Sequence, residues 1–269
     1  IGSGETNGWG YRYLLPLTIA LAMRGATDEA DASLEQLEDH RHPSYGLIEY
    51  ERAVAHAWVK ACHGERSEAV GLAMSAAAKS RTAGQFAAEV VCLQTATQFG
   101  ESSTMTRLHE LAAIVEGPRA VLAARFAAGL RRDGAELELV SSEFERIGDL
   151  AAAVDGSAYA AMAYRRRGLR GSAQASGTRA EAIAAQCGGV STPALRQITA
   201  AVSLTDRERE IAMLIGEGLS SESVARRLKL SVRTVENHIY RAMAKAGADS
   251  RHDLVRMTRR NGMSSRSTE

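Results

Sequence analysis

The chain has 269 residues, of which 45% are hydrophobic and 24% are charged, and its net charge is +1. This length allows one large domain or two ordinary ones, so the size of the core is not limiting. No apolar run reaches the roughly 18–20 residues that cross a bilayer, and no signal-peptide pattern opens the sequence. We therefore expect a cytoplasmic protein that does not bind a membrane.

Alanine and leucine dominate the apolar residues of the chain, which contains only four prolines. No β-branched run of strand length is bounded by turn residues, and this composition predicts an all-α fold.

Glycine turns recur along the first two thirds of the chain. They are Gly25, Gly64, Gly100, Gly134 and Gly168, with spacings of 39, 36, 34 and 34 residues. Each follows an apolar helical pattern and precedes another, as expected of a glycine that ends a helix in the left-handed conformation. A period of this size is typical of stacked helical hairpins, so residues 10–187 are predicted to form a tetratricopeptide-like repeat domain.

Five helical hairpins follow from this pattern. The expected pairs of helices are 10–24 with 27–38, 44–63 with 65–81, 85–99 with 102–116, 119–132 with 134–147, and 149–167 with 172–187. Stacked hairpins leave a concave surface, on which we expect an unknown small-molecule or protein effector to bind. An irregular helical bundle is the alternative, because the aromatic consensus of tetratricopeptide repeats is not matched cleanly.

The residues that usually carry chemistry are scattered. The cysteines Cys62, Cys92 and Cys187 have no metal-type spacing, which favours reduced, buried thiols. No set of Ser, His, Asp or Cys has a recognisable catalytic spacing, and no G-x-x-x-x-G-K-[ST] phosphate-binding motif is present. We therefore expect no enzyme activity, no metal and no cofactor in this chain.

The helical pattern lapses at Gly188, and the sequence from there to Pro193 marks a helix stop. Residues 188–203 are predicted to be a linker. Residues 1–9 are expected to be disordered or a cloning remnant, and residues 261–269 a flexible tail.

Positive charge gathers in the last quarter of the chain. Residues 1–203 carry 20 Lys and Arg against 23 Asp and Glu, whereas residues 204–260 carry 12 against 8. Within the second segment, residues 226–260 hold ten basic and three acidic residues, a net charge of +7. Such a segment is where a phosphate backbone would lie.

Three short helices with hydroxyl caps are predicted in this basic segment. They are residues 206–217 after Thr205, residues 221–229 after Ser220, and residues 232–246 after Ser231. Thr205 and Glu208 have the spacing of a capping box, and Gly218 ends the first helix. This layout is that of a helix-turn-helix, whose last helix enters the DNA major groove.

Apolar residues of the three helices recur at helical spacing and predict a shared core. They are Ile211, Leu214 and Ile215, then Val224, Ala225 and Leu228, then Val235, Ile239 and Met243 or Ala242. Ala225 is expected where two helices cross, because a larger side chain there would push them apart.

The remaining faces of the third helix carry groups that suit DNA. Asn pairs bidentately with adenine, Arg pairs with guanine, and Glu accepts from cytosine. The candidate base contacts are Glu236, Asn237, Tyr240 and Arg241. Hydroxyls, helix N-termini and cations suit phosphate oxygens, and the candidate phosphate contacts are Ser220, Ser221, Lys229, Ser231, Arg233, Thr234, His238 and Lys245.

A fourth helix is predicted at about residues 250–260. Its apolar residues Leu254, Val255 and Met257 complete the core or form the seam of a homodimer. A two-fold dimer would match two half-sites on double-stranded DNA.

These residues closely resemble the LuxR-type helix-turn-helix family, whose pattern is L-T-x-R-E-x-E-[IV], then G-[LM]-S, then S-x-x-T-V-x-x-H. The positions in register are Leu204, Thr205, Arg207, Glu208, Glu210, Gly218, Leu219, Ser220, Ala225, Leu228, Ser231, Thr234, Val235, His238 and Lys245. The resemblance implies a four-helix DNA-binding domain over residues 204–260, with residues 232–246 as recognition helix. Two positions depart from it: Ser223 stands where a glutamate is usual, and Glu236 stands where a lysine is common.

The region before this module indicates the type of LuxR regulator. The strand patterns of a phosphorylated receiver domain and of an autoinducer-binding domain are both absent from the sequence. Helical repeats before the module look like those of the large ATP-binding LuxR-type regulators. The resemblance therefore implies the C-terminal part of such a regulator, with ATP bound in a missing upstream domain.

We conclude from the sequence that the chain is a sequence-specific transcription regulator that binds DNA as a dimer under the control of its repeat domain. Two alternatives stay open. One is a protein-interaction scaffold, and the other is the regulatory fragment of an ATP-dependent switch protein.

Overall fold

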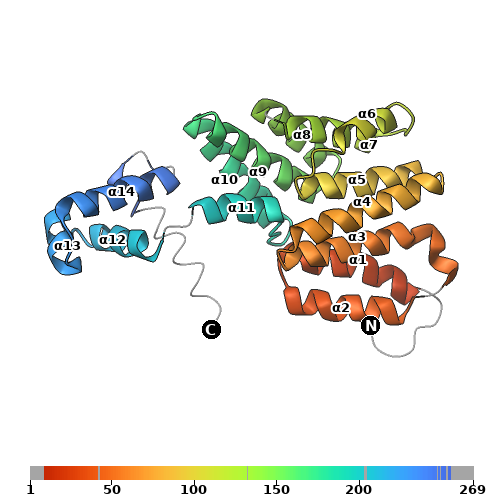
Figure 1. Ribbon diagram of the computed structural model, residues 1–269, viewed down its shortest axis with the longest axis horizontal. Helices are drawn as coiled ribbons and strands as arrows, with labels where there is room; N and C mark the ends of the chain where they lie inside the picture. Colours follow the sequence, from red (N-terminus) through yellow and green to blue (C-terminus); the bar gives the residue numbers. More distant parts are fainter. Residues whose placement is uncertain are drawn as a thin grey trace. The chain divides into compact units, whose positions relative to one another are not determined.

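The computed structural model describes residues 9–41, 43–131, 133–202, 205–246, 248, 250–252 and 254–255. These residues form fourteen α-helices and one 3-10 helix, and they contain no β-strand, so the prediction of an all-α fold is confirmed (Figure 1). The chain divides into two compact units, Ile1–Ile198 and Thr199–Glu269, which we call unit 1 and unit 2.

Unit 1 is a succession of helices in which α1 to α10 each pack against the next along the chain (Figure 1). Their bounds are α1 Trp9–Arg24, α2 Thr27–Asp39, η1 Pro43–Ile48, α3 Glu49–Cys62, α4 Arg66–Thr82, α5 Phe86–Gln98, α6 Met105–Ala112, α7 Pro118–Gly129, α8 Gly134–Arg146, α9 Leu150–Arg166 and α10 Arg170–Gln186. All ten helices predicted in this region occur. Two are shorter than expected, because residues 43–48 form the 3-10 helix and α6 ends at Ala112.

Four of the five glycines predicted to end helices do adopt the left-handed conformation, with φ between 74° and 87° at Gly25, Gly64, Gly100 and Gly168. Gly134 does not, so this part of the prediction was wrong. It is the first residue of α8, and the carboxylate of Asp133 caps that helix by accepting from the amides of Ala135 and Glu136. A Cβ at Gly134 would lie 2.8 Å from the ring of Tyr164, so this glycine serves a close approach instead of a turn.

Small side chains bring the helices of unit 1 close together. Two clusters of buried residues, both rich in alanine, extend over α1–α7 and over α7–α11. Each cluster contains an edge-on aromatic pair: Trp58 against Phe99 in the first cluster, and Phe126 against Phe144 in the second. The order of these clusters along the chain is that of a repeat stack, in which each helix contacts mainly its sequence neighbours.

The segment predicted to be a linker contains a helix, α11, at Pro193–Val202. Its side chains at Ala194, Leu195 and Ile198 are at most 7% exposed and belong to the second apolar cluster of unit 1. Pro193 was interpreted as a helix stop, because it bars continuation of α10. A proline is also well suited to the first turn of a new helix, and here it begins α11. At least residues 193–198 are therefore part of unit 1.

Unit 2 contains α12 Asp206–Gly216, α13 Ser221–Leu228 and α14 Val232–Ala246 (Figure 1). These bounds agree with the sequence prediction to within one residue. The core is formed by the predicted apolar residues, among them Ile211, Leu214, Val224, Ala225, Val235 and Ile239. Residues 251–252 and 254–255 are helical, and the rest of the predicted fourth helix lies outside the described residues.

Candidate nucleic-acid interface

Helix α12 starts at the predicted capping box. The hydroxyl of Thr205 accepts from the amide of Glu208 at 3.2 Å, and the Glu208 carboxylate accepts from the amide of Thr205 at 2.8 Å. The helix is followed by Gly218 with φ 89°, and the amide of Leu219 bonds back to the carbonyl of Leu214. Local hydrogen bonds therefore fix both ends of α12, and α13 and α14 pack against this helix.

The turn between α13 and α14 holds the backbone in an unusual conformation. Lys229 follows α13 with φ 53° and ψ 44°, and among the described residues it alone combines a side chain with a positive φ. The left-handed region costs a non-glycine residue about 1–2 kcal/mol. Arg207 of α12 supports the turn by donating to the carbonyl of Leu228 at 3.0 Å. The side chain of Lys229 is exposed in this turn.

Serine hydroxyls cap the two helices on either side of this turn. Ser220 accepts from the amide of Ser223 at 3.2 Å, and Ser231 accepts from the amide of Thr234 at 3.1 Å. Ser223, which stands where the family has a glutamate, accepts a hydrogen bond from the Ser220 hydroxyl at 3.1 Å. The short serine replaces the return bond of a full capping box with a bond between side chains.

Helix α14 buries one stripe, and its other described side chains are half-buried or exposed. Val235, Ile239 and Ala242 are at most 2% exposed, so of the two alternatives for the third position the structure selects Ala242. Met243 is only half-buried. The buried stripe fixes the rotation of the helix and therefore decides which side chains a ligand can reach.

Three of the four candidate base contacts lie on the open surface. Asn237 and Arg241 are exposed, and Tyr240 is 69% exposed. Among the candidate phosphate contacts, Ser220, Lys229, Ser231 and Arg233 are exposed, whereas Ser221, Thr234 and His238 are half-buried. The side chain of Lys245 lies outside the described residues.

Glu236, the fourth candidate base contact, is engaged within unit 2. Its carboxylate accepts from Arg251 at 2.6 Å, and the same guanidinium donates to the hydroxyl of Ser221 at 3.2 Å. Hydrogen bonding from Ser221 contributes most to lowering the pKa of Glu236, burial opposes it, and Arg251 lowers it further. The sequence analysis treated Glu236 as a free acceptor, whereas the structure makes it one partner in a three-residue cluster.

Arg251 is the residue of this surface that sequence reasoning missed. The available signal was an acidic residue within a strongly basic segment, because such a residue usually forms an ion pair with a nearby cation. Glu236 and Arg251 are 15 positions apart, and no sequence pattern predicted that their side chains would meet. With Arg251 beside it, Glu236 repels a phosphate less than an isolated carboxylate would.

His238 has one of its ring nitrogens, Nδ1, buried and without a hydrogen-bond partner in the described part of the chain. A contact from this residue to phosphate therefore depends on the other nitrogen, Nε2.

The candidate dimer seam is changed by the structure. Leu254 is 1% exposed and packs with Ala212, Ala242 and Ala248, so of the two predicted alternatives it takes the core of unit 2 and not the seam. Val255 is half-buried, and Met257 lies outside the described residues. A seam at this position would therefore rest on side chains other than Leu254.

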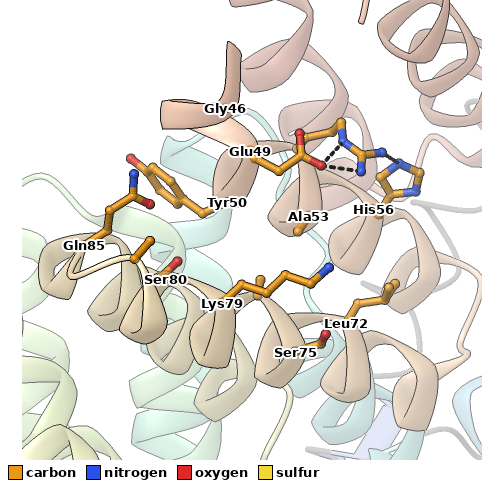
Figure 2. A pocket seen from close by; sticks show the side chains of 13 residues that line it. Gly46, Glu49, Tyr50, Ala53, His56, Leu72, Ser75, Lys79, Ser80 and Gln85 are labelled. Atoms are coloured by element: carbon orange, nitrogen blue, oxygen red, sulfur yellow. Dashed lines mark hydrogen bonds and ion pairs between the residues drawn. The ribbon is translucent and has the colours of Figure 1, made fainter. Parts of the chain in front are cut away.

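Unit 1 carries a hollow of about 340 Å³ between α3 and α4 (Figure 2). Helix α3 contributes Glu49, Arg52 and His56, and Arg52 donates to Glu49 at 2.6 Å. Helix α4 contributes Lys79 with serine hydroxyls nearby, and in Figure 2 the Lys79 side chain extends along the α4 side of the hollow. Lys79 makes no ion pair with any described residue, so its charge is available to an anionic ligand.

Within the described residues, no group of three or more His, Cys, Asp or Glu side chains has a geometry that could hold a metal ion. In the same part of the chain, every helix is too short or too polar to cross a membrane.

Comparison with known proteins agrees with the geometry of unit 2. Residues 202–258 match the family described as bacterial regulatory proteins, luxR family. Rv0890c of Mycobacterium tuberculosis, named as an HTH-type transcriptional regulator, is 45% identical over 60 residues, which are 22% of this chain and 7% of that protein. No solved structure gives a significant match.

Two further relatives are similar over the same region. The response regulator Rre1 of Synechocystis is 37% identical over 62 residues, which are 23% of this chain and 27% of Rre1. The C4-dicarboxylate transport transcriptional regulatory protein DctR of Rhodobacter capsulatus is 44% identical over 79 residues, which are 29% of this chain and 40% of DctR. The chain thus spans less than half the length of each of these relatives.

The capped helices of unit 2, their buried stripe and the family match all concern the same segment of the chain. Residues 202–258 are a LuxR-family helix-turn-helix domain.

Proposed function

We propose that the chain is the DNA-binding part of a transcription regulator, and that α14 enters the major groove of double-stranded DNA. The carrying observation is the open surface of α14, where Asn237, Tyr240 and Arg241 stand exposed on a helix whose other side is fixed in the core. Side chains held this way on a rigid helix suit the reading of base edges. The names of the relatives, all of them regulators, favour the same function.

Phosphate contacts would position α14 in the groove. Arg233, at the start of the helix, and Lys229, in the turn before it, are exposed cations. The N-termini of α13 and α14, with the hydroxyls of Ser220 and Ser231, offer amide and hydroxyl donors to phosphate oxygens. These groups fix the register on the duplex, and the base contacts then specify the sequence.

The test is selection of fragmented genomic DNA by the purified chain, with the Thr234→Ala/Asn237→Ala variant as control. We expect enrichment of a shared motif by the wild type and its loss in the control. A folded wild-type chain that enriches no motif would count against sequence-specific binding by this chain.

We further propose that the regulator acts as a homodimer on an operator with two half-sites. The second half-site would add affinity through effective concentration, without new contacts within either domain. Sedimentation of the chain with DNA that carries one or two copies of the selected half-site tests this, since a dimer predicts two chains per two-site duplex.

We propose that unit 1 controls the regulator by binding an effector, and that the hollow between α3 and α4 is its candidate site. A volume of about 340 Å³ fits a small molecule, and Lys79 would pair with an anionic group. Repeats followed by a LuxR domain also favour a regulator of the large ATP-binding type. In such a protein a separate domain would bind ATP.

A further inference from the structure

The end of unit 1 is bonded to its beginning. The amide of Ser191 donates to the carbonyl of Met23 at the end of α1, at 2.6 Å. The guanidinium of Arg196 donates to the carbonyl of Ala61 near the end of α3, at 2.6 Å, across 135 residues of sequence. We call residues 191–198 the strap, because they join the first helices of the repeat stack to the last.

A buried polar cluster lies where the strap begins. Thr192 is fully buried and caps α11 by accepting from the amide of Leu195 at 3.2 Å. Asp155 of α9 is also fully buried and accepts from the side-chain amide of Gln98 at 2.9 Å. Its second oxygen, Oδ1, has no hydrogen-bond partner in the described part of the chain. A carboxylate with an unsatisfied buried oxygen destabilises the arrangement that encloses it.

The rest of the strap is held by a small apolar contact. Ala194, Leu195 and Ile198 are buried in the second cluster of unit 1. The carbonyl of Ile198 accepts from Arg165 of α9 at 3.3 Å. Three apolar side chains and a few polar bonds make a weaker attachment than the long, alanine-packed contacts between α8, α9 and α10.

The polar attachments of the strap can open without leaving buried groups unpaired. Met23 and Ala61 lie in the last turns of their helices, where carbonyls commonly bond to water. The Ala61 carbonyl also keeps its bond from the amide of Gly64 at 3.1 Å. Opening would in addition admit water to Asp155. These features place the strap among the elements that open locally before the unit unfolds.

The strap is also the element that leads to the DNA-binding domain. Helix α11 ends at Val202 and α12 begins at Asp206, so only residues 203–205 lie between them. With the strap bound, these three residues can span roughly 10 Å at most, whereas residues 190–205 released as an extended chain can span roughly 50 Å. Release of the strap therefore lengthens the tether of the DNA-binding domain several-fold.

We propose that residues 191–198 are a latch: bound, they restrict the reach of the LuxR domain, and released, they let two such domains engage two half-sites together. The proposal rests on the function proposed above. The strap supplies donors to the carbonyls of Met23 and Ala61. A ligand that supplies donors to the same acceptors would favour the released state.

Amide hydrogen exchange of the full-length chain tests whether the strap opens separately. In Arg196→Ala and in Ile198→Ala we expect residues 190–198 to exchange roughly tenfold faster or more, as loss of one charge-assisted bond or one buried side chain implies. Helices α5 and α9 should exchange as in the wild type. Arg179→Ala, which removes an ion pair with Glu145 away from the strap, is the matched control and should leave the strap unchanged. Unchanged exchange of the strap in both strap variants, or equal acceleration throughout unit 1, would overturn the latch.

DNA binding tests what the latch does. With duplexes that carry one or two copies of the selected half-site, Arg196→Ala should bind the two-site duplex several-fold tighter than the wild type does. Both proteins should bind the one-site duplex equally. Equal affinity for the two-site duplex, despite faster exchange of the strap, would overturn the regulatory role. If neither protein binds any duplex, the proposed function fails and the latch loses its role with it, whereas the exchange data still decide whether the strap opens.

Discussion

The two units use their charged side chains in opposite ways. In unit 1, arginines tie helices together: Arg125 of α7 pairs with Glu136 and Glu143 of α8, and Arg52 of α3 pairs with Glu38 of α2. In unit 2, the cations of α13, of α14 and of the turn between them whose side chains the structure describes make no ion pair with any described residue. These cations are Arg226, Arg227, Lys229, Arg233 and Arg241.

The difference follows from what each unit must do with its surface. A stack of alanine-rich helices has few large apolar side chains that could fix how the helices align. Ion pairs between the helices fix this alignment instead. A domain that binds a polyanion gains from cations without internal partners, because they can release counterions from phosphate. The net charge of +1 for the whole chain conceals this division.

Substitution of Glu89 of α5 is the strongest test of whether ion pairs hold the helices of unit 1 together. Its carboxylate is fully buried and accepts from Arg81 of α4 at 2.7 Å and from Arg107 of α6 at 2.8 Å. Glu89→Ala should lower the free energy of unfolding by about 3–5 kcal/mol, because it removes the shared partner of two arginines. Urea denaturation measures this.

Glu110→Ala is the control for Glu89→Ala. Glu110 is 56% exposed and pairs with the same Arg107, so its loss should cost less than about 1 kcal/mol. Equal losses in the two variants would mean that the buried pair does not hold the helices.

Two buried carboxylates of unit 1 should respond to pH with opposite signs. Burial raises the pKa of Glu89, but hydrogen bonds from Arg107 and Arg81 bring it below its usual value. Its contribution to stability is therefore present above the unfolded pKa and is lost in acid. Burial raises the pKa of Asp155 from 3.8 to about 7, against the lowering effect of the neighbouring Thr192 and Gln98 side chains. The contribution of Asp155 is greatest below pH 3.8 and is lost as the pH rises to about 7.

Asp155→Asn isolates the second effect. The other charged groups that act on Asp155 are Asp149, which raises its pKa, and Arg196, which lowers it. Between pH 4 and 7 the wild type should lose up to about 4 kcal/mol of unfolding free energy relative to the variant. Urea denaturation across this range gives both curves, and parallel curves would contradict a buried carboxylic acid at this position.

In unit 2 the comparison becomes sharper when a proposed base contact is set against a proposed phosphate contact. Asn237→Ala should weaken binding to the selected DNA by about 1–3 kcal/mol and leave binding to random DNA unchanged. Arg233→Ala should weaken binding to both, and should reduce the slope of log K against log salt by about 1. Fluorescence anisotropy at several salt concentrations measures both quantities. The same response of the two variants would refute the division of roles.

The sequence predicted most of the helices because their signals are local. Capping residues such as Thr205 and Ser231, and turn glycines such as Gly168, act within one turn of the chain, and the structure confirms them. The glycine period of 34–39 residues captured only every second turn of the stack. Gly84, Gly117 and Gly148 also adopt positive φ and mark the turns in between.

What the sequence missed depends on contacts between distant residues. The strap is held by partners as far away as Ala61, and no pattern in residues 188–203 indicates them. The choice between core and seam, which the sequence left open for Leu254, likewise depends on how the helices cross: Leu254 packs against Ala212 and Ala242. The helix-turn-helix surface was predictable because its candidate base contacts lie on one helix, whereas Arg251 joins it from another segment.

Breaking the Glu236–Arg251 ion pair is expected to have the smallest effect. It is also the finest test of how the two units differ in their use of charged side chains. Both side chains are about half-exposed, so breaking the pair should change the free energy of unfolding by less than about 1 kcal/mol. Its consequence should appear in DNA binding, because Arg251→Ala leaves a carboxylate without its cation on a surface that faces phosphate. We expect Arg251→Ala to bind DNA more weakly than the wild type, and Glu236→Gln to restore affinity when added to it. If adding Glu236→Gln restores no affinity, Arg251 itself contacts the DNA. Unit 2 would then use one more cation in DNA binding than the five that make no ion pair with a described residue.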